Sequence, residues 1–304
     1  MTPVVLDVDG AVGPLAGACR LPLLDWQERL RFGCGLGAMR ALSDELDRAL
    51  PPAAEHGTVF MGSGDFHHLS WPLIVRAVRA RAAGARAARP GTGGLRVLVL
   101  DNHPDNMRFL FGVHCGSWVR RVAALPEVGE VIVAGITSAD IGWRHAWENQ
   151  LAPLRSGKLS YWSVGVDTGW GRWLGLSRAF RNFASVQALT DALVAQLRGD
   201  PRPTYLSIDK DVFAPEVVRT NWDQGRLQEA QAQAVVEALH GQLFGSDVTG
   251  EVSSYRYRTA WKRWLSAQDG QDSEIDQVRL AEWQAGQHRL NERLLGWLGA
   301  ARPG

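Results

Sequence analysis

The sequence predicts one α/β domain of three layers, α/β/α, with helices on both faces of a mostly parallel central sheet. Short apolar runs alternate with longer segments of helical periodicity, which is the order expected of strand–helix–strand crossovers. The apolar runs are continuous rather than alternating, as in strands that are buried on both faces. A chain of 304 residues has the length for two domains. No segment has the composition of a linker, so residues 1–304 are expected to form a single domain.

The expected strands and helices follow from these two patterns. Strands are expected at residues 4–8, 58–62, 97–100, 131–134 and 204–208, with a weaker one near Leu243 and Phe244. Helices are expected at residues 69–81, 186–197, 227–239 and 275–298. In the last helix, Leu290, Leu294, Trp297 and Leu298 share one stripe, which is typical of an amphipathic helix. The Ala- and Arg-rich residues 79–94 are expected to end a helix and continue as a surface loop.

Composition excludes several classes of protein. The 33 Lys and Arg residues nearly balance the 32 Asp and Glu residues, so no overall charge favours nucleic acid or an anionic membrane. No apolar run approaches the roughly 20 residues that span a bilayer. Three cysteines without a CxxC pair argue against a disulfide framework or a cysteine-type zinc site. Asp7 and Asp9 interrupt the apolar N-terminus, which argues against a signal peptide. We therefore expect a cytoplasmic protein.

Acidic and histidine residues follow three of the expected strands, at the edge where open parallel sheets bind ligands. In extended chain, Asp101, His103 and Asp105 project to the same side. An oxygen-rich set with one imidazole suits Mn²⁺ and related ions. Asn102 and Pro104 also fit an ordinary turn, so this cluster alone does not decide between the two interpretations.

The other two clusters follow the strands at 204–208 and 58–62. Asp209 and Asp211 should repel each other unless a cation or base neutralises them, and Lys210 is expected to point to the other face. In the Gly-rich loop that follows residue 61, His67 and His68 point in different directions, so at most one joins a shared site. Each cluster alone fits a loop; together they fit two divalent ions that share bridging carboxylates and activate a water between them.

The order and approximate spacing of these motifs resemble those of the arginase/agmatinase (ureohydrolase) superfamily. The chain therefore resembles a divergent member of that superfamily. That family carries a GGDH-type loop, a DAHxD strand end and an SxDxDxxDP segment. The corresponding residues here are Gly64-Asp65-Phe66-His67, Asp101-Asn102-His103-Pro104-Asp105, and Ser207 to Pro215. The match runs from about residue 58 to residue 253. It implies an arginase-like fold and two Mn²⁺ ions per chain.

The resemblance also implies a role for each matched residue. Asp101 and Asp209 would bridge the two ions. His67 and Asp105 would complete one metal site. His103 and Asp211 would complete the other. His67 is preferred to His68 because it lies five residues before Pro72, as in the family's agmatinase-like pattern.

Two further residues match catalytic positions of the family. His114 resembles a histidine that shuttles protons, and an imidazole that titrates near neutrality suits donation to a leaving amine. The alternative is a core histidine that caps the following helix. Glu251 resembles a late glutamate that holds a guanidinium, and a carboxylate is the natural partner of that planar cation. Its segment carries one extra residue, so a surface position is the alternative.

Departures from the family pattern concern substrate recognition. Residues 216–225 replace the family's glycine-rich pocket loop with a shorter segment of different chemistry. Arginine and agmatine are therefore not assumed as substrates. Trp222 lies in this segment and is the best candidate for a stacking wall. The other tryptophans near the expected pocket are predicted to pack the core or an oligomer interface: Trp71, Trp118, Trp143, Trp147, Trp162, Trp170 and Trp173.

The resemblance implies a hydrolase of a linear, non-peptide C–N bond in a small molecule, with a hydroxide between two Mn²⁺ ions as nucleophile. A guanidino substrate would release urea. The alternatives are a deacetylase-like amide hydrolase on the same metal centre and a non-catalytic, metal-stabilised binding protein. The resemblance is also compatible with a homo-oligomer, since arginase relatives are often trimers or hexamers. Asp7 and Asp9 also match the start of a haloacid-dehalogenase-type phosphatase, whose other motifs are not found.

Overall fold

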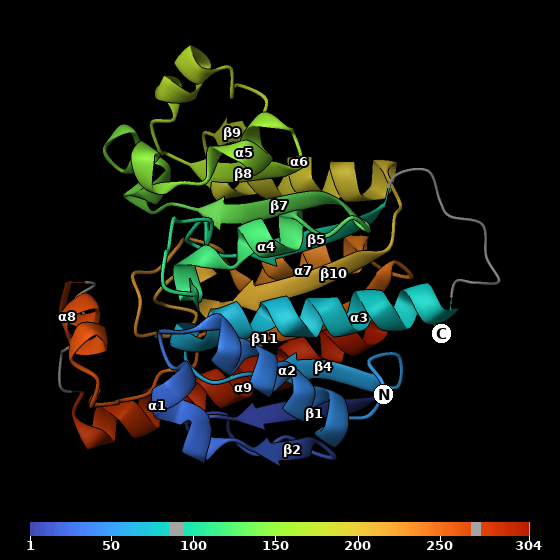
Figure 1. Cartoon of the computed structure of the whole chain (residues 1–304). Helices are drawn as coiled ribbons and strands as arrows, with labels where there is room; N and C mark the ends of the chain where they lie inside the picture. The colour runs from blue at the N-terminus through green and yellow to red at the C-terminus, as the bar shows by residue number, and fades with distance from the viewer. Residues whose placement is uncertain (85–93, 269–274, 304) are drawn as a thin grey trace.

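A nine-stranded, entirely parallel sheet forms the centre of the computed structural model, which describes residues 1–84, 94–268 and 275–303 (Figure 1). The strand order is β2-β1-β4-β11-β10-β5-β7-β8-β9. The strands are β1 (Thr2–Asp7), β2 (Cys19–Pro22), β4 (His56–Phe60), β5 (Leu95–Leu100), β7 (Val128–Ile136), β8 (Leu159–Val164), β9 (Phe180–Phe183), β10 (Thr204–Asp209) and β11 (Leu243–Thr249). Two short strands, β3 (Gly33–Cys34) and β6 (Val113–His114), pair separately and antiparallel.

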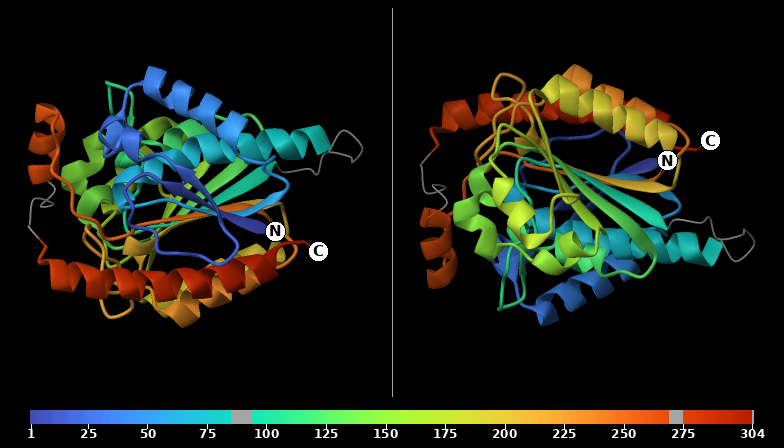
Figure 2. Two further views of the ribbon diagram at one scale, coloured as in Figure 1. Left: turned by 90° about the horizontal axis from the view of Figure 1, so that it is seen from below. Right: turned by 90° about the horizontal axis from the view of Figure 1, so that it is seen from above.

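Helices cover both faces of this sheet, as the two views in Figure 2 show. One face carries α2 (Leu36–Ala49), α3 (Ser70–Gly84), α4 (Val119–Ala123) and α5 (Leu151–Arg155). The other carries α6 (Val186–Gly199), α7 (Glu229–Ala238) and α9 (Gln277–Ala301). The remaining helices are α1 (Gln27–Leu30), α8 (Ala260–Gln268) and the short 3-10 helices, among them η2 (Gly64–Leu69) and η7 (Gly169–Leu174). The predicted three-layer α/β/α class is confirmed.

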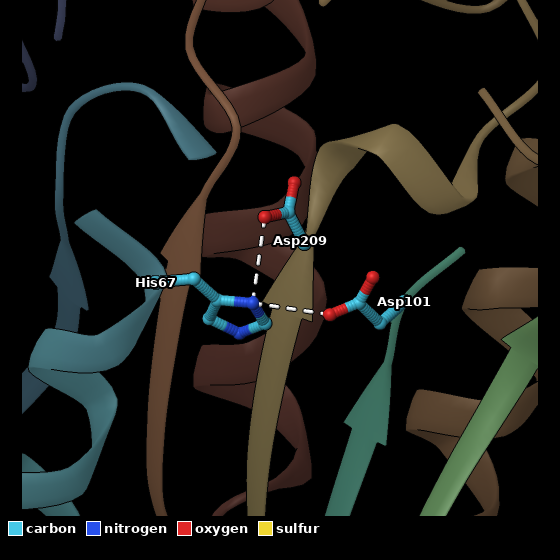
Figure 3. A group of neighbouring side chains, drawn as sticks. All are labelled: His67, Asp101 and Asp209. Atoms are coloured by element: carbon cyan, nitrogen blue, oxygen red, sulfur yellow. Dashed lines mark ion pairs between the residues drawn. The ribbon is translucent and has the colours of Figure 1, made fainter. Parts of the chain in front are cut away.

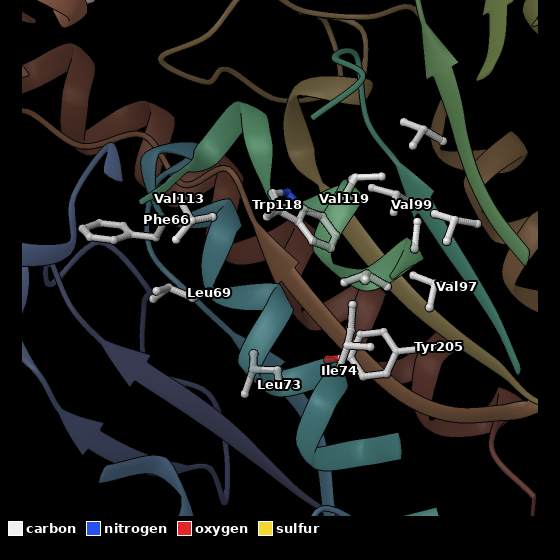
Figure 4. Close-up of a cluster of buried hydrophobic side chains, with 14 of the residues drawn as sticks. Phe66, Leu69, Leu73, Ile74, Val97, Val99, Val113, Trp118, Val119 and Tyr205 are labelled. Carbon is white, nitrogen blue, oxygen red and sulfur yellow. The ribbon is translucent and has the colours of Figure 1, made fainter. Parts of the chain in front are cut away.

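Side chains of the central strands alternate between two separate cores, which explains why the strands read as continuous apolar runs. Val97 and Val99 pack with α2, α3 and α4, in the core that Figure 4 shows in part. Leu98 and Leu100 pack with α6, α7 and α9 on the opposite face.

The elements predicted from periodicity are present with shifted ends. The weak strand near Leu243 is the full-length β11, and the C-terminal helix begins at Gln277 and ends at Ala301. The two edge strands, β2 and β9, and the strand β8 next to β9 were not predicted. The expected helix at residues 69–81 is α3, whereas residues 85–93 of the expected surface loop lie outside the described residues.

All nine parallel strands have their carboxyl ends at the same edge of the sheet. The register between the two central strands β5 and β10 places the predicted ligand segments that follow them side by side at this edge. Ile208 of β10 pairs with Leu100 of β5, so the next residues, Asp209 and Asp101, are neighbours at the carboxyl ends. Among the helices of the described residues, none is both long and apolar enough to cross a bilayer.

Candidate metal centre

Side chains from the three predicted motifs converge at the carboxyl ends of β5 and β10. His67, on η2, directs Nδ1 between Asp101 and Asp209, with distances of 3.1 Å to Asp101 Oδ2 and 3.4 Å to Asp209 Oδ2 (Figure 3). The same nitrogen lies 2.8 Å from Asp105 Oδ2. All four side chains are buried. His68 is also buried but lies outside this group and does not line the cavity described below.

A second group shares Asp101 with the first. His103 Nδ1 lies 2.9 Å from Asp211 Oδ2 and 3.6 Å from Asp101 Oδ1. Both sets, His67–Asp101–Asp209 and Asp101–His103–Asp211, offer ligand atoms within 4.8 Å of one another. Asp101 thus lies between two sets of potential ligands. Asp209 belongs to the first set, and its Oδ1 accepts a hydrogen bond from the Asp211 N–H at 3.1 Å.

The outer nitrogen of each imidazole is held by a protein group. His67 Nε2 lies 3.0 Å from Ser207 Oγ, and Ser207 in turn donates to Asp247 Oδ1 at 2.6 Å. His103 Nε2 lies 2.7 Å from Asp223 Oδ1. When Nε2 donates outward, a neutral ring presents the lone pair of Nδ1 to the carboxylates. Metal-ligating histidines are oriented by outer partners in this way.

Four carboxylates and two imidazoles make up this cluster, so its charges balance only when its side chains take up protons or a cation binds. Burial and the nearby Asp101 charge raise the pKa of Asp105 to about 7. Burial raises the pKa of Asp209 to about 6. Burial, together with the Asp209 charge, raises the pKa of Asp211 well above its usual range. Although burial opposes protonation, Asp105 and Asp101 hold the pKa of His67 well above its ordinary value. Carboxylate oxygen and imidazole nitrogen are ligands that suit Mn²⁺ and similar divalent ions, so the residues present fit such ions.

Two glycines, Gly64 and Gly250, have no side chain and so make room for the carboxylate of Asp209. A Cβ on Gly64 would lie 3.1 Å from Asp209 Oδ2 and 2.9 Å from Trp222 Cδ1. Gly250 has a φ of +89°, and a Cβ there would collide with Asp209 Oδ1 and with the backbone nitrogen of Lys210. The second position therefore requires glycine both for its backbone conformation and for this close approach.

His114 is the one predicted catalytic residue that reaches the cluster's cavity. It ends β6, and its Nδ1 accepts a hydrogen bond from the Gly116 N–H at 3.1 Å, so it also caps the following turn. Burial lowers the pKa of His114 to about 4. The expectation of an imidazole that titrates near neutrality is therefore wrong for the metal-free protein, because desolvation disfavours the charged ring.

Glu251 does not face this cavity, contrary to its expected role in holding a guanidinium. Its Oε1 lies 2.7 Å from Lys210 Nζ and accepts a hydrogen bond from Asn291 Nδ2 at 2.6 Å. Lys210 points away from Asp209 and Asp211, as predicted, and is fully buried. A buried ammonium requires a counter-charge, and Glu251 provides it.

The N-terminal aspartates take part in other ion pairs. Asp7 Oδ1 lies 3.2 Å from Arg20, and Asp9 Oδ2 lies 3.6 Å from the buried Arg31. Asp9 also accepts a hydrogen bond from the Ser63 N–H at 3.1 Å. Neither aspartate lines the cavity. This arrangement does not support the phosphatase interpretation.

A cavity of about 600 Å³ opens over the cluster. All six predicted ligands and His114 line it, together with Trp222, whose ring lies edge-on to His103 with centroids 5.7 Å apart. Of the other tryptophans, Trp118, Trp162 and Trp170 are buried, Trp71 is half-buried, and Trp143, Trp147 and Trp173 are exposed. Trp147 also lines the cavity.

Sequence reasoning assigned no role to several residues that orient the ligands. Asp223, in the loop after β10, holds His103. In the sequence, its position next to Trp222 was the only indication of a role in the site. Trp118 was expected to be a core residue, and it also donates from Nε1 to Asp105 Oδ2 at 2.6 Å. Ser207 and Asp247 hold His67 from neighbouring strands. No local pattern reveals such contacts, because they form between distant segments.

No family model matches the chain. An uncharacterized protein from Thermotoga maritima is 24% identical over 219 residues, which cover 72% of this chain and 65% of that protein, less than two thirds of its length. The chain is similar to solved structures that include a hypothetical agmatinase from Burkholderia thailandensis (15% identity, 98% of this chain and 85% of that one, TM-score 0.48). A Trypanosoma cruzi formiminoglutamase with Mn²⁺ (17% identity, 88% and 72%, TM-score 0.47) and an arginase from Bacillus caldovelox (12%, 79% and 76%, TM-score 0.43) are further examples.

Proposed function

We propose that this chain is a two-metal hydrolase of a linear, non-peptide C–N bond, that its substrate is a guanidino compound, and that urea is one product. One observation carries the proposal. His67 and His103 both direct Nδ1 into a set of buried carboxylates while a protein group holds Nε2. This is the arrangement of metal-ligating histidines, and the cluster lies in a cavity large enough for a small substrate.

The proposed ligands divide as the sequence predicts. Asp101 and Asp209 would be shared by the two ions. His67 and Asp105 would bind on one side, and His103 and Asp211 on the other. Two divalent ions, for which we propose manganese, would supply an activated water and stabilise the charge that develops during hydrolysis. The outer hydrogen bonds to Ser207, Asp223 and Trp118 would keep the ligands in these orientations.

His114 is the proposed proton carrier of the reaction. Its Nδ1 accepts from the Gly116 N–H, so the neutral ring carries its proton on Nε2. With a pKa lowered to about 4 by burial, the ring is neutral at pH 7. It would therefore give the Nε2 proton to the departing amine and regain one at the same atom from the attacking water, so that the ring is neutral before and after the step.

An amide hydrolase is the second candidate, and the position of Glu251 favours keeping it. The side chain expected to recognise a guanidinium is paired with Lys210 instead. The three carboxylates that line the cavity beyond the ligands favour a cationic guanidino substrate: Asp140, Glu148 and Asp223.

Cytoplasmic location and assembly into a homo-oligomer remain predictions from the sequence.

Elemental analysis of the purified protein, followed by a screen of guanidino and N-acyl compounds with added Mn²⁺, tests the proposal. We expect about two metal ions per chain and release of urea. The variant His114→Ala should keep its metal and lose roughly 100-fold or more in turnover, as expected for a proton carrier. Metal loading without turnover of any compound would instead identify a binding protein, and release of an acid would identify the amide hydrolase.

A further inference from the structure

A continuous row of rings leads from the candidate metal centre toward solvent. We call it the aromatic band; it consists of Trp222, Phe32, His114, Phe109 and Trp261. Trp222 lies next to His103 and is stacked with Phe32 at 6.4 Å. Phe32 is stacked with His114 at 6.0 Å, and His114 meets Phe109 edge-on at 4.5 Å. Phe109 then lies 6.4 Å from Trp261, so each ring contacts the next.

Most of the aromatic band lies in the wall of the cavity. Four of its five members line the cavity, and the fifth, Trp261, lies on α8. Trp222 at the inner end is half-buried, Phe32 next to it is 4% exposed, and Trp261 at the outer end is 42% exposed. Figures 1 and 2 place α8 beyond the carboxyl ends of the strands, on the side of the sheet where the cluster lies.

Phe32 is fixed in an unusual backbone conformation. Its φ is 65°, in the left-handed region that bulky residues rarely adopt. Its N–H donates to the Asp65 carbonyl at 3.0 Å, and its own carbonyl accepts from the Cys115 N–H at 3.0 Å. Such strain persists only where the surroundings enforce it, and it concentrates at ligand-binding positions. The ring is therefore held rigidly against the cavity rather than free to fold away.

The charges along the cavity favour a cationic ligand. Beyond the six predicted metal ligands, Asp140, Glu148 and Asp223 line it, and among the described residues Arg108 is the one lysine or arginine that does so. The buried Lys262 lies 5.5 Å from the Trp261 ring, but its ammonium donates to the backbone carbonyls of residues 28, 29 and 31. Aromatic faces bind both flat rings and cationic groups, and acidic neighbours strengthen the attraction of a cation.

We infer that the aromatic band is a subsite for the substrate's tail, and that the substrate is an arylalkylguanidine, with its guanidinium at the carboxylate cluster and its ring against Phe32 and Phe109. This inference rests on the proposed hydrolysis of guanidino compounds. It adds a substrate class, since a short amino-acid-like or purely aliphatic tail would leave these rings unused.

The Mn²⁺-loaded protein is tested with three guanidines: 2-phenylethylguanidine, agmatine and methylguanidine. Urea release gives kcat/KM, and calorimetric titration gives the Kd of each compound. We expect kcat/KM for 2-phenylethylguanidine to exceed the values for the other two by about tenfold or more, mainly through KM. Its Kd should be lower by a similar factor.

Variants locate the effect on the aromatic band. Phe109→Leu and Phe32→Gly should each lower the ratio of kcat/KM for 2-phenylethylguanidine over methylguanidine by about tenfold. Glycine suits the left-handed backbone at position 32, so that variant removes the ring without adding strain. Trp173→Leu is the matched control, because Trp173 is 86% exposed and lies outside the cavity. In this variant the ratio of kcat/KM for the two guanidines should not change.

The outcomes separate this inference from the proposed function. Equal or better hydrolysis of agmatine or methylguanidine would overturn the arylalkyl assignment and leave the hydrolase intact. Tight, Phe109-dependent binding of 2-phenylethylguanidine without turnover of any guanidine would support the subsite and count against the hydrolase. Absence of both preferential binding and preferential turnover would overturn the subsite.

Discussion

Two buried clusters of charge lie side by side at the end of β10, and they differ in one respect. Lys210 and Glu251 form a pair of opposite charges, completed by Asn291. On the other face, the predicted ligands bring four carboxylates together with two imidazoles. The first cluster is neutral with the protein's own atoms. The second holds more negative charge than its imidazoles neutralise, and the raised pKa values of Asp105 and Asp209 are the result.

This difference separates a structural site from a candidate functional one. A balanced pair fastens α9 to the sheet and requires nothing further. An unbalanced cluster at the base of a cavity is stable only when protonated or when a cation is bound. The asymmetry arises between adjacent residues, because Lys210 and Asp211 point to opposite faces of the same short turn.

The largest effect is expected from the unbalanced side. Asp209→Asn removes a carboxylate from the first ligand group and should strip metal and lower hydrolysis by more than the roughly 10–100-fold expected for an outer partner. The fold should persist, because Asp209 is not part of the Lys210 pair. Elemental analysis and urea release check this, with Asp191→Asn on the exposed side of α6 as control. Full metal content in Asp209→Asn would contradict the bridging role.

A substitution on the balanced side should affect stability instead. Lys210→Met leaves Glu251 buried without its counter-charge and should lower the free energy of unfolding by about 3–5 kcal/mol. The double variant Lys210→Met/Glu251→Gln should recover part of that loss. Urea denaturation measures both values, and metal content per folded chain should be unchanged. A change in KM for guanidines without a change in stability would return Glu251 to substrate recognition.

A smaller effect should follow from pH in the metal-free protein. The pKa of Asp105 is raised to about 7 and that of Asp209 to about 6, so the folded state binds more protons than the unfolded state above about pH 4. Protonation of these two carboxyls should therefore stabilise the fold progressively less as pH rises from 4.5 to 7.5 in chelator, and the difference in unfolding free energy between the wild type and Asp105→Asn isolates the contribution of Asp105. Asp105→Asn should flatten this profile, and Mn²⁺ should stabilise most at the upper end. A pH profile of Asp105→Asn identical to that of the wild type would show that the carboxylates are not strained by their mutual charge.

The central fold was predictable because its signal is local. Continuous apolar runs gave the inner strands, and periodicity gave α3, α6, α7 and α9. The edge strand β9, Phe180–Phe183, was missed because an edge strand is short and partly exposed, so its sequence alternates weakly. The ends of elements shifted because capping and packing decide them rather than the hydrophobic pattern.

The positions of site residues that directly follow a strand could be predicted from the sequence. The orientations and roles of residues farther from the strand ends could not. Asp101 and Asp209 follow from strand register, and the motif spacing singled out His67. The orientation of Glu251 depends on the positive φ of Gly250 and on the demand of Lys210 for a counter-charge. Neither can be read from residue spacing. The roles of Asp223 and Trp118 likewise depend on contacts that only the folded chain creates.

The pairing of β5 with β10 has an evolutionary consequence. Asp101 and Asp209 are adjacent because Leu100 and Ile208 pair in register, and a strand's side chains change face with every residue. One inserted or deleted residue inside either strand would turn a carboxylate to the opposite face, whereas the loops beyond can diverge in length and composition. Descendants of this chain can therefore acquire new specificities by altering those loops, provided that the two strands keep their lengths.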